Sequence, residues 1–277
     1  MVTRIVLAFC LTASLVSIWP FFFSARAETV ANNTKKKEHY DWQGAIGGKI
    51  PVSVWLETRD GLIAGEIVYT KTKEKKPIRL LGTASQEYLY MKEMVNGLVT
   101  GFIAGTVKDG VFEGIWRMPD KIKEKNGDYE FIDGKELSIR LVAAPNQSGS
   151  FRWEYDPDAL AGQYVYSYGN NAASGAVDVA RAKDGSIEFS IGSHIGAPSF
   201  NMVDVPAIEP DAKEPGKIKG RLLGNRILHE MDADCAFEIL FFNDFLVIRY
   251  LEGRTCNGWF GRGAGIEGQF MRQGKQP

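Results

Sequence analysis

Apolar and polar residues alternate in short segments along the chain after residue 40. In the first such segment, Val52, Val54 and Leu56 alternate with polar or aromatic neighbours. Four later segments repeat the same period of two, residues 137–141, 187–191, 218–222 and 237–241. Because a period of two places one row of side chains on each face of a strand, the pattern predicts half-buried antiparallel strands.

Glycine marks the breaks between these segments. Asp-Gly or Asn-Gly pairs stand at 60–61, 96–97, 109–110, 126–127, 133–134 and 184–185. Such pairs tolerate the positive φ that a tight hairpin turn requires. Further glycines inside the segments predict bulges and bends where a sheet curls. With few helical windows between them, the turns predict an all-β protein built from antiparallel meanders.

The strand pattern stops over residues 143–158, which run from Ala-Ala-Pro-Asn-Gln-Ser-Gly-Ser to Asp-Pro-Asp. We therefore predict two β domains, residues 38–145 and 159–277, joined by a linker over 146–158. Each half has room for roughly eight short strands, and we expect each to form a small lipocalin-like barrel or a sandwich. A short motif recurs at 111–116 and 265–270. A duplication and two similar closing strands would both explain it.

The first residues have the composition of a targeting segment. Residues 5–25 are uncharged and strongly apolar and follow Arg4. The stretch is closed by Ala25-Arg26-Ala27, with small residues on both sides of the arginine. This pattern predicts a signal peptide over 1–27, cleaved after Ala27, followed by a polar, disordered lead over 28–37. Since about 20 apolar residues also span a bilayer, a retained N-terminal anchor is the alternative. Both readings place the folded part outside the cytoplasm, in the periplasm or secreted.

The charge balance excludes one class of partner. The chain has 33 basic and 34 acidic residues, and cleavage removes Arg4 and Arg26 but no acid, which leaves a net charge of −3. A nucleic-acid-binding protein would need a basic stripe, so we expect no nucleic-acid partner. The basic run Lys71, Lys73, Lys75 and Lys76 would suit peripheral contact with an anionic membrane surface. A solvated hairpin tip is the alternative reading.

Two cysteines remain after cleavage. Cys10 leaves with the signal, so Cys235 and Cys256 are the pair present in an oxidising compartment. A disulfide is the natural reading, and closing a loop of this length should contribute on the order of 3 kcal/mol. A metal site is disfavoured because no His or further Cys stands nearby at ligand spacing.

Residues 220–272 contain the most distinctive sequence pattern of the chain. Cys235 opens an apolar strand, Cys256-Asn257-Gly258-Trp259 follows, and Gly268-Gln-Phe-Met-Arg272 closes the segment. This resembles a pattern in small bacterial periplasmic β domains, including ones attached to lysozyme-inhibitor-like proteins. There a strand cysteine pairs with one in a Cys-x-x-Gly segment, and a Gly-x-Tyr-x-Arg strand ends the chain. Here Phe270 replaces the tyrosine and the context of Cys256 differs. The resemblance brings no catalytic residues and implies a secreted domain that binds envelope components or enzymes.

Histidine offers little chemistry. The chain has three, His39, His194 and His229, and none has a second ligand at metal spacing. His194 follows Ser193, but neighbours in an extended chain point in opposite directions, so the two cannot act as a pair. We expect His194 in a surface loop, His39 in solvent and His229 on the solvent face of a strand. The sequence predicts no catalytic residue, metal site or cofactor.

Acids and tryptophans supply the remaining candidates. Glu113 and Glu267 occupy equal places in the recurring motif and are the best pair for two-carboxylate hydrolysis. Their alternative role is that of solvent-facing strand residues. Trp55 stands on the polar register of its strand, while Trp259 and Arg262 lie in a glycine-rich stretch after Cys256. We take these three as candidate binding residues, with core packing as the alternative for the tryptophans.

These patterns favour a non-enzymatic, extracytoplasmic binding protein for a protein, glycan or lipid ligand of the envelope. Inhibition of a cell-wall-degrading enzyme is its most specific form. The alternatives are a secreted hydrolase that uses carboxylates and a tethered factor for envelope assembly or structure. A hydrolase should gather acids of raised pKa in one pocket, whereas a binding protein should expose an apolar or aromatic patch without them.

Overall fold

The computed structural model describes residues 38–144, 149, 151–206, 216–254, 256, 260 and 264–274. These residues belong to one compact unit, Lys35–Pro277. They are all-β, as the sequence predicted, with nineteen strands and one short 3-10 turn, η1 (Pro157–Ala159). None of the described residues forms a helix with the length and apolar character needed to cross a bilayer. The predicted signal peptide, anchor and polar lead lie outside the described residues.

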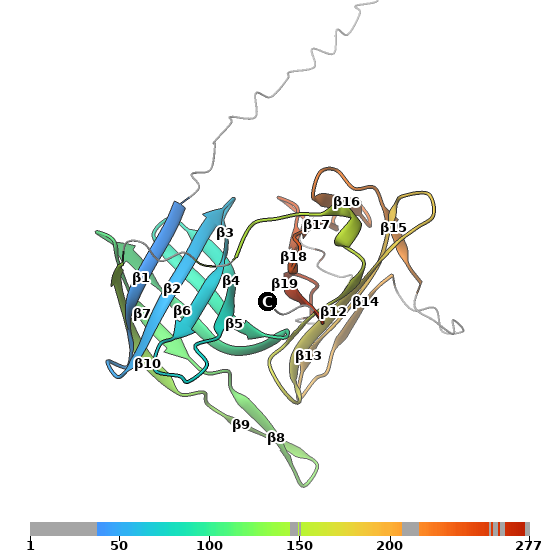
Figure 1. Ribbon diagram of the computed structural model, residues 1–277. Coiled ribbons are helices and arrows are strands. Elements are labelled where there is room, and N and C mark those ends of the chain that lie inside the picture. The colour runs from blue at the N-terminus through green and yellow to red at the C-terminus, as the bar shows by residue number, and fades with distance from the viewer. Residues whose placement is uncertain are drawn as a thin grey trace, which may run out of the picture. The chain divides into compact units, whose positions relative to one another are not determined.

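Eight strands close an antiparallel barrel (Figure 1). Its first seven strands pair in chain order: β1 (Glu38–Ile46), β2 (Ile50–Arg59), β3 (Leu62–Tyr69), β4 (Pro77–Ser85), β5 (Tyr88–Val95), β6 (Leu98–Lys108) and β7 (Val111–Arg117). The eighth, β10 (Glu136–Ala143), pairs with both β7 and β1 and so closes the ring. Between β7 and β10, the strands β8 (Lys121–Lys125) and β9 (Asp128–Ile132) form a separate hairpin that extends from the barrel (Figure 1).

The barrel follows from the alternation in the sequence. One residue in two points inward, and these side chains form a core that includes Trp42, Leu56 and Phe112. Four Asp-Gly or Asn-Gly pairs adopt positive φ at both residues, at 60–61, 96–97, 109–110 and 126–127. This conformation suits the two-residue hairpin turns that the sequence predicted. The pair at 133–134 does not adopt it and lies between β9 and β10.

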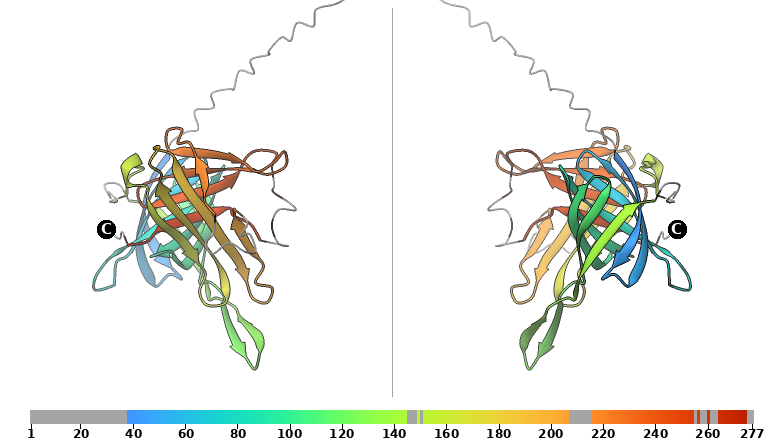
Figure 2. Two further views of the ribbon diagram at one scale, coloured as in Figure 1. Left: turned by 90° about the vertical axis from the view of Figure 1, so that its right-hand side faces the viewer. Right: turned by 90° about the vertical axis from the view of Figure 1, so that its left-hand side faces the viewer.

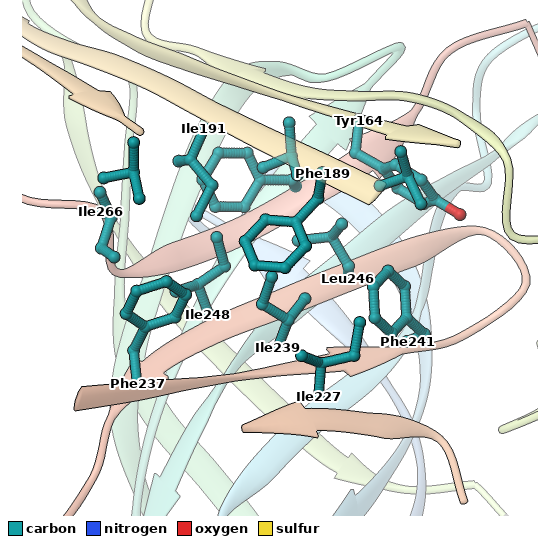
Figure 3. Packing of buried hydrophobic residues seen from close by; sticks show 14 of the residues in the cluster. Tyr164, Phe189, Ile191, Ile227, Phe237, Ile239, Phe241, Leu246, Ile248 and Ile266 are labelled. Carbon is teal, nitrogen blue, oxygen red and sulfur yellow. The ribbon is translucent and has the colours of Figure 1, made fainter. Parts of the chain in front are cut away.

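Additional strands lie outside the barrel (Figures 1 and 2). They are β11 (Gly162–Ser167), β12 (Ala172–Arg181), β13 (Ile187–Gly196), β14 (Met202–Val205), β15 (Ile218–Gly220), β16 (Arg226–Glu230), β17 (Ala236–Phe241), β18 (Phe245–Tyr250) and β19 (Gly268–Arg272). Pairing runs β16–β17–β18–β19–β11–β12–β13, and β13 pairs with both β14 and β15. We call these nine strands the second sheet. Its inward side chains form a second core around Tyr164, Phe189 and Ile239 (Figure 3).

A third core joins the barrel to the second sheet. Trp55 and Leu81 from the outer face of the barrel pack in one cluster with Phe151 and Phe245. The two halves are also hydrogen-bonded, because Ser167 of β11 donates its N–H to the Gly97 carbonyl at 2.8 Å. Two separate domains are therefore not shown. Phe151, in the stretch predicted as a linker, is only 2% exposed.

Candidate functional site

A groove of about 500 Å³ lies where the β5–β6 turn of the barrel approaches the second sheet. Asn96, Gly97 and Leu98 form one wall, and strands β11 to β14 supply the floor and the opposite wall. We call it the seam groove. The parallel pairing of Ser167 with Leu98 fixes the distance between wall and floor. The groove is therefore a feature of the hydrogen-bonded framework.

Small side chains on the floor of the seam groove leave the groove open above them. In the register of β12 and β13, Ala176 lies opposite Gly192 and Ser174 lies opposite His194. The rim carries apolar side chains that are unusually open to solvent, since Met202 is 64% exposed and Leu98 is 44% exposed. Asp204 is the charged acid among the described residues that line the groove. An apolar rim over a polar floor is typical of a binding site.

The groove contains a serine–histidine contact. Ser174 Oγ lies 2.7 Å from His194 Nε2. His194 stands on strand β13 and not in the predicted surface loop. Ser193 points to the other face and donates to the Gly265 carbonyl at 2.6 Å. The expectation that Ser193 is not the partner of His194 is confirmed.

This contact lacks the third member of a catalytic triad. The other ring nitrogen, His194 Nδ1, is buried and has no hydrogen-bond partner among the described residues. A triad needs an acid there, because the acid holds the imidazole in the correct tautomer and stabilises the imidazolium. Asp204 stands opposite Gly192, two residue pairs along the ladder from the pair formed by His194 and Met202. The arrangement offers a polar anchor for a ligand and does not complete a nucleophile.

One end of the barrel interior holds a buried acid. Glu93 is 2% exposed, and the Tyr69 hydroxyl donates to its Oε1 at 2.6 Å. A methyl group added at Gly101 would meet both Glu93 Oε2 and Trp116 Nε1, which places the indole nitrogen close to the carboxylate. Burial raises the pKa of Glu93. The acid occupies the space that Gly101 leaves, with Tyr69 and Trp116 as its polar neighbours there.

The predicted disulfide is present. Cys235 and Cys256 are joined by a bond of 2.07 Å across a sequence separation of 21 residues. Cys235 lies just before β17, where its N–H donates to Asp232 Oδ1 at 2.7 Å. Two of the predicted binding residues near this bond, Trp259 and Arg262, lie outside the described residues.

Trp55 faces outward from its strand, as the register predicted, but it is not available for binding. Its side chain is 7% exposed. The indole ring lies 6.1 Å from that of Phe151 and meets His39 edge-on at 5.3 Å. The prediction of a contact residue at this position is therefore corrected: the outer face of β2 is covered by residues from beyond the barrel, and core packing is the role that the structure supports.

Glu113 and Glu267 do not share a site in the structure. Glu113 is exposed on β7 and pairs with Arg140 Nε at 2.9 Å. Glu267 is exposed beside β19 and accepts the Tyr250 N–H at 3.3 Å. Strands β7 and β19 do not pair with each other in the described sheet. Their predicted alternative role as solvent-facing strand residues fits both positions.

The other charged and titratable candidates divide by burial. The four lysines of the basic run are all exposed in the β3–β4 turn: Lys71, Lys73, Lys75 and Lys76. Lys76 pairs with Glu74 at 2.7 Å. Contact of these lysines with a membrane stays a prediction.

His229 is not on the solvent face. Its ring packs 5.2 Å from that of Phe237, and burial lowers its pKa.

No group of three or more metal-ligating side chains occurs within the described ranges. The seam groove was not predicted from the sequence. The one sign of it in the sequence is the run of small residues Ala173-Ser-Gly-Ala176, which leaves a strand without bulky side chains on either face. That signal does not say which distant segment forms the opposite wall.

Comparison with known proteins adds one remote similarity. No protein-family model matches the chain, and no curated protein matches it. Among solved structures, a protein of unknown function from the DUF3598 family of Nostoc punctiforme is similar over 77% of this chain and 78% of that chain, with 10% sequence identity and a TM-score of 0.26. A match at that TM-score carries no conclusion about fold or function.

Proposed function

We propose that this protein is a non-enzymatic binding protein of an extracytoplasmic compartment, and that the seam groove receives an extended segment of a protein partner. The carrying observation is the pairing of an exposed apolar rim, Leu98 and Met202, with a low polar floor. A hydrolase site would show several acids in one pocket, whereas Asp204 stands alone in this respect among the described lining residues.

The groove favours a neutral or basic polypeptide. Asp204 supplies a negative charge, and none of the described lining residues is a lysine or arginine. Beside the groove, β14 pairs with β13 alone among the described strands. An edge strand offers free backbone donors and acceptors to an added chain. The apolar side chains of such a segment would lie against Leu98 and Met202 while its backbone runs beside β14.

The compartment is supported by the disulfide, because such bonds persist in oxidising spaces. The resemblance of residues 220–272 to domains of lysozyme-inhibitor-like proteins supports a specific form of the proposal, in which the partner is a cell-wall-degrading enzyme. Blocking that enzyme would then require only that the seam groove hold a segment of its surface.

Site-specific photo-crosslinking in the native envelope tests the proposal. A benzoylphenylalanine in place of Met202 should crosslink to one dominant protein. The same residue in place of Leu228, which is 42% exposed on β16, is the matched control and should give no such product. Equal products from both positions, or none from position 202, would rule out the groove as the contact.

Filling the floor provides a second arm. Ala176→Phe should abolish the crosslink from position 202, because the ring would occupy the groove. Ala180→Phe adds the same bulk four residues further along the same face of β12, outside the groove. This control should leave the crosslink intact. Loss of the product in both variants would indicate a folding defect and would not support the site.

A further inference from the structure

The outer face of the barrel carries a second pocket, away from the seam groove. It has a volume of about 340 Å³ over strands β5, β6 and β7. Its origin lies in the strand register: Ala104 on β6 stands between Tyr90 on β5 and Ile115 on β7. A small side chain surrounded by larger ones leaves a hollow. We call it the Ala104 pocket.

Aromatic rings form one side of the Ala104 pocket. The rings of Tyr90 and Phe102 lie 6.1 Å apart and are inclined by only 26°. Behind them, Tyr168 from the β11–β12 turn lies 5.7 Å from Phe102 at 20°. The three rings therefore form a nearly parallel row, supported by the second sheet. Tyr90 and Phe102 line the pocket, and each is held by a neighbouring ring. Little side-chain conformational entropy is therefore lost when a ligand packs against them.

A pair of opposite charges forms the other side. Arg117 Nη2 lies 2.5 Å from Asp120 Oδ1, which also accepts the Gly134 N–H at 2.8 Å. Asp120 Oδ2 and the Nε and Nη1 atoms of Arg117 make no hydrogen bond to any part of the chain that the structure describes. Both side chains are more than one-third exposed. Among the described residues, the site thus holds one free carboxylate oxygen and free guanidinium donors side by side.

We infer that the Ala104 pocket binds one ring of a neutral glycan. A pyranose has an apolar face of C–H groups and an edge of hydroxyl groups. The C–H face matches the negative face of an aromatic ring such as that of Tyr90, which stands at the end of the row. Adjacent hydroxyls both donate and accept, which matches the free oxygen of Asp120 and the free N–H groups of Arg117.

The charge of the pocket selects against an anionic ligand. Arg117 is already neutralised by Asp120, and a second carboxylate, Asp133 Oδ1, lies 3.9 Å from its Nη2. The remaining described lining residues, Ala104, Ile115 and Met118 among them, carry no charge. An anion would gain no net attraction and would face the Asp120 carboxylate. A neutral ligand with hydroxyl groups loses nothing on this account, since each buried polar group finds a partner. The site is independent of the seam groove, and either assignment can fail without the other.

Titration with soluble trisaccharides tests this inference. The purified protein is mixed with maltotriose, cellotriose or chitotriose, and binding is followed by saturation-transfer NMR and calorimetry. Binding of at least one sugar is expected. Ala104→Phe fills the pocket and should weaken that binding at least about tenfold. Asp120→Asn keeps the shape but alters the polar edge, and should weaken it by a smaller factor.

Thr106→Phe is the matched control, because Thr106 is exposed two residues further along the same face of β6 and does not line the pocket. It should leave binding unchanged, and near-ultraviolet circular dichroism should show the native fold for all three variants. The inference is overturned if no trisaccharide binds at millimolar concentration, or if Ala104→Phe and Thr106→Phe have equal effects. It is equally overturned if indole, a flat aromatic probe, binds in an Ala104-dependent way while the sugars do not.

Discussion

Arg79 on the outer face of the barrel reaches Asp244 in the β17–β18 turn, with Nη2 and Oδ2 3.3 Å apart. The same guanidinium lies 3.1 Å from Glu66 Oε1 through Nη1 and 4.7 Å from the centre of the Phe151 ring. Arg79 and Glu66 are both almost fully buried, whereas the Asp244 side chain is 38% exposed. One arginine therefore links the barrel, the segment after it and the second sheet.

Replacing Arg79 should be far more damaging than replacing Asp244. Arg79→Met removes the buried cation that faces Glu66, and breaking a buried pair from one side costs about 3–5 kcal/mol. Asp244→Asn leaves that pair intact and removes a partly solvated contact, which is worth under about 1 kcal/mol. Urea unfolding of the two variants measures the difference in the free energy of unfolding.

The double variant Arg79→Met/Glu66→Met provides the control. Removing both charges should restore most of the stability, because the hydrophobic replacement has no buried charge to desolvate. If Arg79→Met costs no more than Asp244→Asn, the arginine does not hold the halves together.

Glu93 should make the protein less stable as the pH rises. Burial raises its pKa above the ordinary 4.5, so the folded protein keeps a proton that the unfolded chain releases. The stability linked to that proton is complete below pH 4.5 and is lost as the pH climbs through the folded pKa. Glu93→Gln cannot ionise and still accepts from Tyr69, so its free energy of unfolding should rise relative to that of the wild type between acid and mildly alkaline pH.

Chemical unfolding at several pH values would reveal this trend. Glu113→Gln is the matched control, because Glu113 is exposed and pairs with Arg140 at the surface. Its stability should follow the wild type across the same range. A wild-type profile that runs parallel to that of Glu93→Gln would mean that the buried acid is ionised in the folded state at no cost.

The sequence predicted the parts of this fold that depend on neighbours along the chain. Alternation identified strands such as β2 and β13, and the Asn-Gly and Asp-Gly pairs identified their hairpins, because both signals are local. The disulfide followed from compartment and cysteine count. Alternation also assigned one face of every strand to solvent. There it failed for Trp55, which is 7% exposed, and it gave no sign that Arg79, also 7% exposed, would be buried.

These errors have a common physical cause. Trp55 is covered by Phe151, and Arg79 is paired with Asp244, so these two outward residues of the barrel are buried by segments distant in sequence. Nothing within a strand shows that its polar face will meet another sheet. The seam groove was missed for the same reason. Ser174 and His194 meet because β12 and β13 pair in one register, which a single sequence does not display.

The disulfide should stabilise the second sheet by restricting the unfolded chain. It closes a loop with a sequence separation of 21 residues, for which chain entropy gives about 3 kcal/mol. The double variant Cys235→Ser/Cys256→Ser should lose roughly that amount, measured by urea unfolding without reductant. Wild type treated with reductant should approach the same value, whereas reductant should not change the variant. Unchanged stability in the double variant would show that the bond does not constrain the fold.

The glycine at 114 lies where two strands approach too closely for a side chain. A Cβ added to Gly114 on β7 would lie 2.1 Å from the Ala104 carbonyl oxygen and 2.7 Å from the Gly105 Cα. Backbone atoms cannot rotate away as a side chain can, so Gly114→Ala should destabilise the barrel by about 2 kcal/mol or more, a cost typical of overpacking. Gly110→Ala is the control: its φ of +78° strains an alanine, but no atom of the described residues lies within 4 Å of the added Cβ, which limits the cost to about 1 kcal/mol. Thermal unfolding of both variants compares the two costs, and equal values would show that β6 and β7 can separate to admit a methyl group.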